Sequence, residues 1–564
     1  MPWKNCLPPR RKTDSGIPVG LPAKKEGPPL ASDRKQSFLH GAALLAAATA
    51  IVKVIGALYK IPLGNIIGDA GFGYFNTAYD IYSVLLMIST AGLPVAMSRM
   101  IAESASLGNY GQIRRTYQTA QYIFLGLGAA GTILMTCFSR QLAGFMNSPN
   151  SWAAIAALGP AAILMCQTSA FRGFFQGQGN MRPTSFSEVL EALCKLVVGL
   201  GLAYLIMATR KDTALAAGGA ILGVTTGSFV ATIFMYRAYR IARWEQPLTG
   251  GPVFSYGSTA KKLLAIAIPI TVGSAGLQII TLIDAKVVMS QLIGPAGFTQ
   301  AEADSLKGIY NFAQTIFNLP CAFIPPITIS VLPAITGQLT LRNFRAARNL
   351  EESAARVTGL VTMPCAIGLA VMAQPVMALL RGYEGETLVT AGNLLAVLGL
   401  CVVFNSVVLL TNAIMQAHGY VYLPVMNMFL GGIIKVIVNY ILVSNPEINI
   451  QGAPVGTLCC YLSITILNIF AMRKVIRKAP SIPKNLLKPF LAALVMGIVA
   501  FGSWKLTAMV TSSRLLQCAL PILLAGVVYV LLAVRMQVIT YADCMLLPKG
   551  EKIAQLLHIR KKQG

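Results

Sequence analysis

The chain has 564 residues, of which 55% are hydrophobic and 12% are charged, whereas soluble domains are about 25% charged. This composition excludes a soluble enzyme. A membrane-crossing helix needs about 20 apolar residues, so the apolar residues of this chain are enough for roughly fourteen crossings. The formal net charge of +26 would suggest nucleic acid as a partner in a soluble protein, but in a membrane protein it indicates basic cytoplasmic loops.

Residues 1–37 are rich in Pro, Lys and Arg and lack apolar periodicity, which predicts a disordered basic tail. The apolar run over 38–64 is too long for a signal-peptide core, so we expect it to remain as the first membrane helix. Further apolar runs lie near residues 75–101, 116–138, 150–175, 183–208, 215–236, 259–290, 306–334, 353–379, 388–415, 421–444, 450–472, 486–509 and 514–537.

Lys and Arg are strongly biased to one side when the loops between these runs are assigned alternately. The side that includes the tail receives 33 of the 46 bases. The other side receives only Arg140, Arg210, Lys211, Lys307, Arg381 and Arg514. Since the basic side is cytoplasmic, the bias predicts fourteen helices with both termini in the cytoplasm.

Part of the first half recurs in the second half. Gln176 and Lys195 of the first half correspond to Gln416 and Lys435 of the second half, and Pro94 corresponds to Pro326. The recurrence predicts an all-α membrane protein of two six-helix lobes, related by a pseudo-two-fold axis along the membrane normal, with two additional helices. Chance recurrence of Gly and Pro is the alternative. The predicted units are 1–37 (tail), 38–240 (first lobe), 241–258 (cytoplasmic linker), 259–473 (second lobe), 486–537 (additional helices) and 538–564 (cytoplasmic tail).

The second and eighth helices contain helix-breaking residues, at Gly92 and Pro94 and at Pro320, Pro325 and Pro326. Broken helices at membrane depth are tolerated where they line a cavity, so both are candidates for moving, cavity-lining helices. Static kinks are the alternative.

Several ionisable residues lie inside the predicted helices, where a charge is costly and therefore suggests function. Lys53 and Lys60 share a small and polar face of the first helix, and Asp80 lies at a depth that would allow a pair with Lys60. Asp284 and Lys286 lie in the seventh helix. Bases outnumber acids, which favours an anionic substrate in a central cavity. Structural ion pairs between helices are the alternative.

A second polar group follows in the fifth helix, where Glu188, Glu191 and Lys195 share one face. Glu191 and Lys195 are spaced for a local ion pair, with a proton or cation relay as the alternative. Asn427 and Asn439 could provide oxygen ligands to a coupling cation. The eleven cysteines include no CxxC pair and the three histidines are scattered, so we expect no metal site and no cofactor.

Short outer loops leave no room for the external domain that a membrane glycosyltransferase or polymerase usually carries. We therefore expect a transporter and not an enzyme. No P-loop is present, so membrane potential or a coupled ion would drive transport.

The segments 53–63, 91–96 and 171–177, the last containing Arg-Gly-Phe-Phe-Gln-Gly, resemble the multidrug/oligosaccharidyl-lipid/polysaccharide exporter superfamily. Within it, they resemble the polysaccharide-biosynthesis branch, with the stage V sporulation protein B group and the lipid II flippases. The resemblance covers residues 38–540. It implies a V-shaped cavity between two lobes and a groove on the last two helices for a lipid tail.

The resemblance also implies a function. We expect a monomeric flippase in the bacterial plasma membrane that moves an undecaprenyl-pyrophosphate-linked saccharide to the outer leaflet. Its partners would be this substrate, membrane lipids and proteins of cell-wall synthesis, and not nucleic acid. The pyrophosphate would bind Lys53, Lys60 and Lys286, with Asp80 and Asp284 positioning these bases, and Pro94, Arg172, Gln176 and Pro326 would serve gating. Lipid II flippases have essential arginines on the first and second membrane helices. Here the first-helix positions are lysines, Lys53 and Lys60, so a bidentate clamp becomes point-charge contacts. A cation-coupled multidrug extruder is the alternative.

Overall fold

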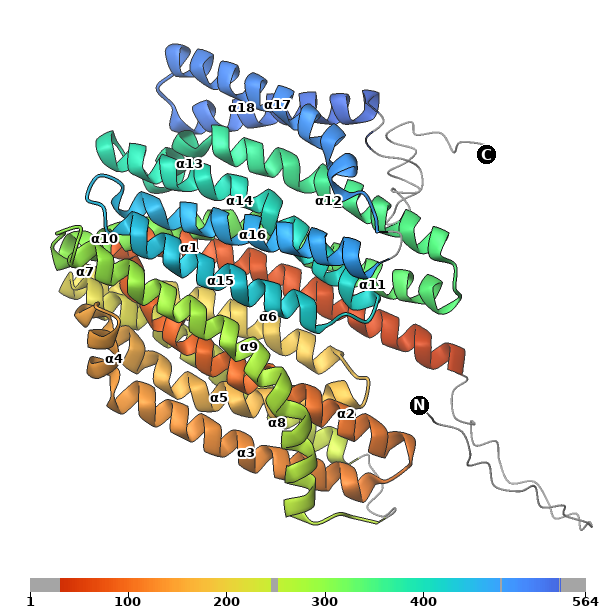
Figure 1. Cartoon of the computed structure of the whole chain (residues 1–564). Coiled ribbons are helices and arrows are strands. Elements are labelled where there is room, and N and C mark those ends of the chain that lie inside the picture. The colour runs from red at the N-terminus through yellow and green to blue at the C-terminus, as the bar shows by residue number, and fades with distance from the viewer. Residues whose placement is uncertain (1–30, 245–251, 477–478, 537, 539–564) are drawn as a thin grey trace, which may run out of the picture.

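Long helices lie side by side through the whole molecule, as the computed structural model in Figure 1 shows. The structure describes residues 31–244, 252–476, 479–536 and 538, and no strand occurs among them. The predicted tails 1–37 and 538–564 and the centre of the linker 241–258 therefore lie largely outside the described residues. The first helix begins at Ala31, inside the predicted N-terminal tail.

The first half of the chain forms eight helices and a short π-helix, η2. They are α1 (Ala31–Thr90), α2 (Leu93–Ser106), α3 (Tyr110–Cys137), α4 (Ser139–Phe145), α5 (Trp152–Gly177), α6 (Arg182–Cys194), η2 (Lys195–Gly199), α7 (Leu200–Arg210) and α8 (Thr213–Trp244). The remainder forms α9 (Tyr256–Ile293), α10 (Gln300–Cys321), α11 (Ile324–Thr340), α12 (Phe344–Val371), α13 (Ala373–Arg381), α14 (Gly385–Ala417), α15 (Tyr422–Val443), α16 (Gly452–Val475), α17 (Ile482–Val510) and α18 (Arg514–Arg535).

Helix α1 is a hairpin of two helices that turns at Gly68. The Gly68 φ of 70° is accessible to glycine at little cost, and it interrupts the helix without a loop. The rings of Tyr59 and Phe75 lie 5.9 Å apart, whereas residues with this separation would be about 24 Å apart along a straight helix. The predicted first and second helices are therefore joined by a tight turn.

Twelve segments of the described residues are long and apolar enough to cross a membrane. One of them, Ala47–Ser106, contains the hairpin and so provides two crossings. The broken pair α10–α11 is not among the twelve, and fourteen crossings remain the prediction. The breaks themselves are confirmed, because α1 ends before Gly92 and α11 begins at Ile324 with Pro at its N-terminus.

The order of elements is similar in the two halves. A broken helix is followed by a helix capped by Asn109 in α3 and by Asn343 in α12, each accepting a hydrogen bond from a backbone N–H. A short helix follows, α4 or α13, and later a turn with a positive-φ glycine, Gly179 or Gly419. These correspondences support the predicted repeat. We use the caps and the hairpin to name the two ends of the bundle, the Asn109 end and the Gly68 end.

Helix α9, which begins the predicted second lobe, packs on both halves. Near its start, Leu263 and Ala267 join a core of residues from α2, α3, α5 and α8. Near its end, Asp284 contacts α15. Pro269 lies between these parts, and Figure 1 shows the helix bending along its length.

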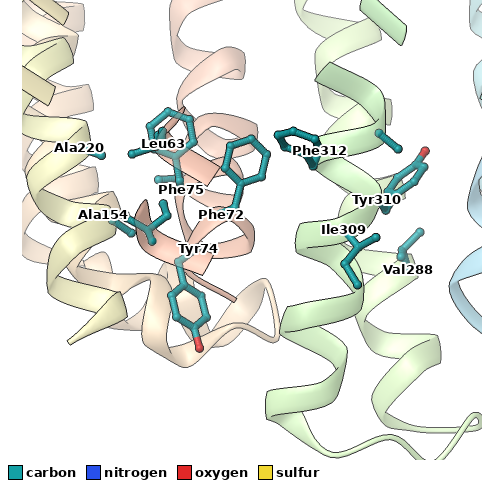
Figure 2. Packing of buried hydrophobic residues seen from close by; sticks show 14 of the residues in the cluster. Leu63, Phe72, Tyr74, Phe75, Ala154, Ala220, Val288, Ile309, Tyr310 and Phe312 are labelled. Atoms are coloured by element: carbon teal, nitrogen blue, oxygen red, sulfur yellow. The ribbon is translucent and has the colours of Figure 1, made fainter. Parts of the chain in front are cut away.

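The two halves meet tightly at the Gly68 end. Phe72 of α1 and Phe312 of α10 point toward each other in Figure 2, with ring centroids 5.8 Å apart, and both are fully buried. Gly73 and Gly308 bring the two backbones together, because a Cβ at Gly308 would collide with the Asp69 carbonyl. Small residues of this kind allow close helix packing in membranes.

Apart from α9, whose start packs on the first half, the halves separate toward the Asn109 end. Among the described residues, the hydrogen bonds and ion pairs that join α1–α8 to α10–α18 lie toward the Gly68 end. Along α1, Tyr59 and Leu63 are fully buried, whereas Ile51 and Val54 are about half exposed. The arrangement therefore resembles a V that is closed at the Gly68 end.

Candidate functional site

Six ionisable side chains gather close to this closed junction. Asp80, on the second arm of the α1 hairpin, lies 3.6 Å from the ammonium of Lys307 on α10. Lys307 is 3% exposed and also donates to the hydroxyl of Thr77, 2.9 Å away. The expected Lys60–Asp80 pair is not formed. Lys60 instead donates to the Asn76 amide oxygen at 3.5 Å.

A second ion pair lies in the second half. The Asp284 carboxylate of α9 lies 2.8 Å from the Lys435 ammonium of α15 and accepts a hydrogen bond of 2.5 Å from Asn439. Asp284 and Asn439 are buried. Charges in this environment are stable only when paired and hydrogen-bonded, so the pair fixes α9 against α15.

Lys195 does not form the predicted pair with Glu191. The Glu191 carboxylate contacts Arg172 and Ser228 instead, each at 3.3 Å. The Lys195 ammonium lies over the rings of Tyr59 and Tyr79, 5.0 and 5.1 Å from their centroids, in a cation–π arrangement. It also lies near enough to Lys60 for the two charges to repel each other.

The two ion pairs lie within electrostatic range of each other, because Asp284 acts on Asp80. We call the following residues the junction cluster: Lys60, Asp80, Lys195, Lys307, Asp284 and Lys435. Four bases stand against two acids, and the cluster joins helices of both halves. Such an excess of positive charge at membrane depth can bind an anion and can couple that binding to movement of the halves.

The other two predicted pyrophosphate ligands lie outside this cluster. Lys53 is exposed and forms no ion pair among the described residues, and it lies within electrostatic range of Cys321 on α10. Lys286 lies 3.6 Å from the centroid of the Phe145 ring of α4. The structure therefore brings Lys60 near Asp80, and Asp80 near Asp284, whereas the contacts of Lys53 and Lys286 lie elsewhere.

The Arg-Gly-Phe-Phe-Gln-Gly motif is a packing element as well as an ion-pair site. Gly173 lies against the backbone of Pro94, and Gly177 lies against Ser98 and Ile101, so the motif brings α5 close to the broken helix α2. Arg172 pairs with Glu191 of α6. Gln176, at the end of α5, accepts a backbone bond from Gly179.

The remaining predicted polar residues contact side chains of other helices or lie at a helix break. Glu188 is half-buried and interacts with Thr49 and Arg172. Asn427 donates to Asn468, which donates in turn to Thr411 and Asn412. This network resembles the interhelical hydrogen bonds that join membrane helices. Pro326 lies in the first turn of α11, at the break.

Sequence reasoning missed the polar residues that close the Gly68 end. Asp69 follows the hairpin turn and is bound by Arg381, at the end of α13, and by the Tyr383 hydroxyl. Burial raises the pKa of Tyr383, so the hydroxyl stays protonated and donates. Arg381 also donates to Asn65, at 3.2 Å. Only the folded structure brings these segments together.

Lys307 could have been found from the sequence. Asp304, Lys307, Asn311 and Thr315 lie at helical spacing on one face of α10, a polar stripe inside a membrane helix. Assigning Lys307 to an outer loop concealed this pattern.

No group of three or more His, Cys, Asp or Glu side chains suited to a metal ion occurs in the part of the chain that the structure describes. The absence of a metal and of a cofactor therefore stays a prediction. The nine cysteines that the structure characterises are free thiols.

A family model for polysaccharide biosynthesis proteins matches residues 38–337, which is more than half of the chain. The chain belongs to this family. It is similar to stage V sporulation protein B of Bacillus subtilis, with 22% identity over 83% of this chain and 91% of that protein. It is also similar to the lipid II flippase MurJ of the same organism, with 23% identity over 82% and 87% of the two chains.

Solved structures share the fold. An inward closed conformation of the lipid II flippase MurJ matches 89% of this chain and all of that chain, with a TM-score of 0.66 and 14% identity. An inward-facing multidrug resistance transporter of the MATE family, in the MOP superfamily, matches 78% and 95%, with a TM-score of 0.56 and 16% identity. The chain is thus a multi-pass, all-helical membrane protein of the MOP exporter fold, as the resemblance implied.

Proposed function

We propose that the chain is a flippase that moves an undecaprenyl-pyrophosphate-linked saccharide from the inner to the outer leaflet of the bacterial plasma membrane. The junction cluster carries the proposal, since its excess of lysines suits a pyrophosphate and lies where the two halves meet. Alternating opening at the Asn109 and Gly68 ends would expose this site to each side in turn. In this reading the Asn109 end and both termini are cytoplasmic.

An apolar groove in the second half suits a lipid tail. It has a volume of about 410 Å³ and is lined by α10, α12, α13, α17 and α18, including Leu319, Met496 and Gly526. Helix α10 carries Lys307 and also contributes to this groove, so one helix connects a charged site with an apolar one. This combination fits a substrate with an anionic head and a long hydrocarbon tail.

The head-group part of the proposal is tested in cells depleted of their own flippase. We expect Lys60→Ala to abolish complementation and the exposure of lipid-linked precursor to an outer-leaflet probe, while the protein still inserts. Lys505→Ala is the matched control, because Lys505 lies over the Phe501 and Trp504 rings, far from the cluster in the chain. Normal growth with Lys60→Ala would contradict the proposal.

The tail part is tested by filling the groove. A Cβ at Gly526 would meet nothing within 4 Å, and Gly526 lines the groove, so we expect Gly526→Phe to fill part of it. We expect it to slow translocation, whereas Gly502→Phe should have no effect, since Gly502 is equally open but does not line the groove. Equal rates for the two variants would show that the groove is not used.

A multidrug extruder is the second candidate, supported by the fold shared with the MATE transporter. A site for cationic drugs should be rich in acids, whereas the junction cluster is rich in bases. Drug resistance conferred by the wild-type chain, with no change in precursor exposure, would favour this candidate.

A further inference from the structure

A small cavity lies inside the first half, between α1, α3 and α5. Its volume is about 160 Å³. The lining is apolar except for Tyr82 and Ser89 of α1 and Cys166 of α5. In another protein, an engineered apolar cavity of about 150 Å³ binds benzene. The cavity is therefore large enough for one molecule of about the size of an aromatic ring.

The cavity opens toward the membrane. Leu127 and Leu134 of α3 line it, and they are 39% and 41% exposed. Helix α3 is long and apolar enough to cross a membrane, and Figure 1 shows it at the edge of the bundle. Exposed apolar side chains on such a helix face lipid, so a molecule dissolved in the membrane can reach the cavity.

One polar group of the lining has no partner. The Ser89 hydroxyl donates to the Leu85 carbonyl at 2.9 Å and accepts from the Cys166 thiol at 3.0 Å. The Tyr82 hydroxyl is buried and has no hydrogen-bond partner among the described residues. It lies within electrostatic range of Cys166, across the cavity lining on α5. Buried hydroxyls are normally hydrogen-bonded, so an unpartnered one at a cavity indicates a missing acceptor.

Water suits this place poorly. A buried water usually makes about two to four hydrogen bonds to polar groups. The lining side chains offer the Tyr82 hydroxyl, whereas Ser89 and Cys166 already bond to each other. An uncharged organic molecule needs one hydrogen bond here, and it gains free energy by placing its remaining surface against apolar side chains.

We propose that this cavity binds a small lipophilic carbonyl compound, of about the size of a substituted benzene ring, which enters from the membrane and accepts a hydrogen bond from the Tyr82 hydroxyl. The proposal is independent of the flippase function, because no residue of the junction cluster or of the lipid-tail groove lines the cavity. The bound molecule contacts α1, α3 and α5 together. Since α1 ends just before the break at Gly92, such a ligand holds this arm of the hairpin in place beside the break.

The test uses the purified full-length chain in lipid nanodiscs. Acetophenone is the probe, and α-methylstyrene is a hydrocarbon of the same shape without the carbonyl oxygen. An acetophenone analogue with a diazirine group labels the protein on illumination, and mass spectrometry identifies the labelled peptides. We expect labels on the parts of α1, α3 and α5 that line the cavity. Excess acetophenone should displace the analogue at a lower concentration than α-methylstyrene does.

Tyr82→Phe removes the hydroxyl and keeps the ring. We expect it to weaken acetophenone binding about three- to tenfold, the net value of one hydrogen bond, and to leave α-methylstyrene binding unchanged. Tyr79→Phe is the matched control, because the Tyr79 hydroxyl is also buried and unpartnered but Tyr79 does not line the cavity. Partition of the probes into lipid is the same for every variant, so the difference reports the hydroxyl.

A second variant fills the cavity. A Cβ at Gly131 would lie 3.3 Å from Ala162 and 3.5 Å from Leu85, so Gly131→Leu places its side chain among the lining residues. We expect it to prevent labelling there. Gly126→Leu, also on α3, should label as the wild type does, because nothing lies within 4 Å of its Cβ position and Gly126 does not line the cavity. Thermal unfolding checks that both variants fold, and Tyr82→Phe decides if Gly131→Leu does not.

Two results would overturn the proposal. One is labelling that spreads over lipid-facing helices and is not displaced by excess acetophenone. The other is equal displacement by acetophenone and α-methylstyrene in the wild type, since the Tyr82 hydroxyl would then contribute nothing. Neither result bears on the flippase proposal, which precursor exposure tests separately.

Discussion

The first and second halves use the same order of helices but treat an equivalent lysine in opposite ways. In the second half, Lys435 and Asp284 form a buried pair that joins α15 to α9. In the first half, Lys195 faces aromatic rings and Lys60, and the nearby acids are occupied by other bases. The two halves therefore share one order of helices, but the lysine of the second half joins two helices through an ion pair, whereas the equivalent lysine of the first half has no ion pair among the described residues.

The largest expected effect comes from removing the buried ion pair of the second half. Lys435→Ala leaves Asp284 buried without a counter-charge, which should cost about 3–5 kcal/mol of stability. Lys195→Ala should cost far less, because no carboxylate loses a partner. Thermal unfolding in nanodiscs measures both, and the double variant Lys435→Ala/Asp284→Asn should recover much of the loss. Equal costs for the two lysines would remove the asymmetry between the halves.

The next effect concerns the contact between the halves. Gly308→Val places a side chain against the Asp69 carbonyl, so α1 and α10 can no longer approach, at a cost of about 1–3 kcal/mol to the closed arrangement. Spin labels can be placed at the exposed positions Lys211 and Glu386 in a variant without native cysteines. We expect double electron–electron resonance to show a longer distance between these labels in Gly308→Val. Gly337→Val is the control, because nothing lies within 4 Å of its Cβ position. An unchanged distance in Gly308→Val would show that this contact does not hold the end closed.

The polar tie at the same end should contribute less than the backbone contact. Arg381→Ala removes one of the two partners of the partly buried Asp69 carboxylate, which keeps the Tyr383 hydroxyl, so it should cost only about 1 kcal/mol. Lys262→Ala removes an ion pair with Glu103 in which both side chains are more than half exposed, and it should cost under about 1 kcal/mol. The distance between the same two labels should increase in Arg381→Ala and should not change in Lys262→Ala. A larger change with Lys262→Ala would contradict the assignment of the tie to the Gly68 end.

The helical membrane fold was predictable because composition and helix-breaking residues act locally. Gly92 with Pro94, and Pro325 with Pro326, break their helices where the sequence places them. Partners were not predictable in the same way. Asp80 was assigned to Lys60, whereas α10 brings Lys307 to it from more than two hundred residues away.

The closure of the Gly68 end shows the same limit. Asp69 is held by Arg381 and Tyr383, and their meeting depends on how α13 packs near the α1 hairpin. No spacing in the sequence reports that contact. The presence of lysines inside the membrane helices was thus readable from the sequence, except for Lys307, whereas their division into paired and unpaired lysines required the tertiary structure.

The smallest expected effect lies where the halves agree. Asn109 and Asn343 cap equivalent helices by accepting bonds from Gln112 and Ala346, of 3.0 and 3.1 Å, so alanine at either position should cost about 1 kcal/mol. Asn109 also donates to the Pro252 carbonyl at 2.8 Å, so Asn109→Ala should cost slightly more. Thermal unfolding should show both losses. Serine should restore the cap at each position, but at position 109 it should not restore the hydrogen bond to the Pro252 carbonyl. A loss in only one half would mean that the repeat preserves the order of helices but not the way in which they begin.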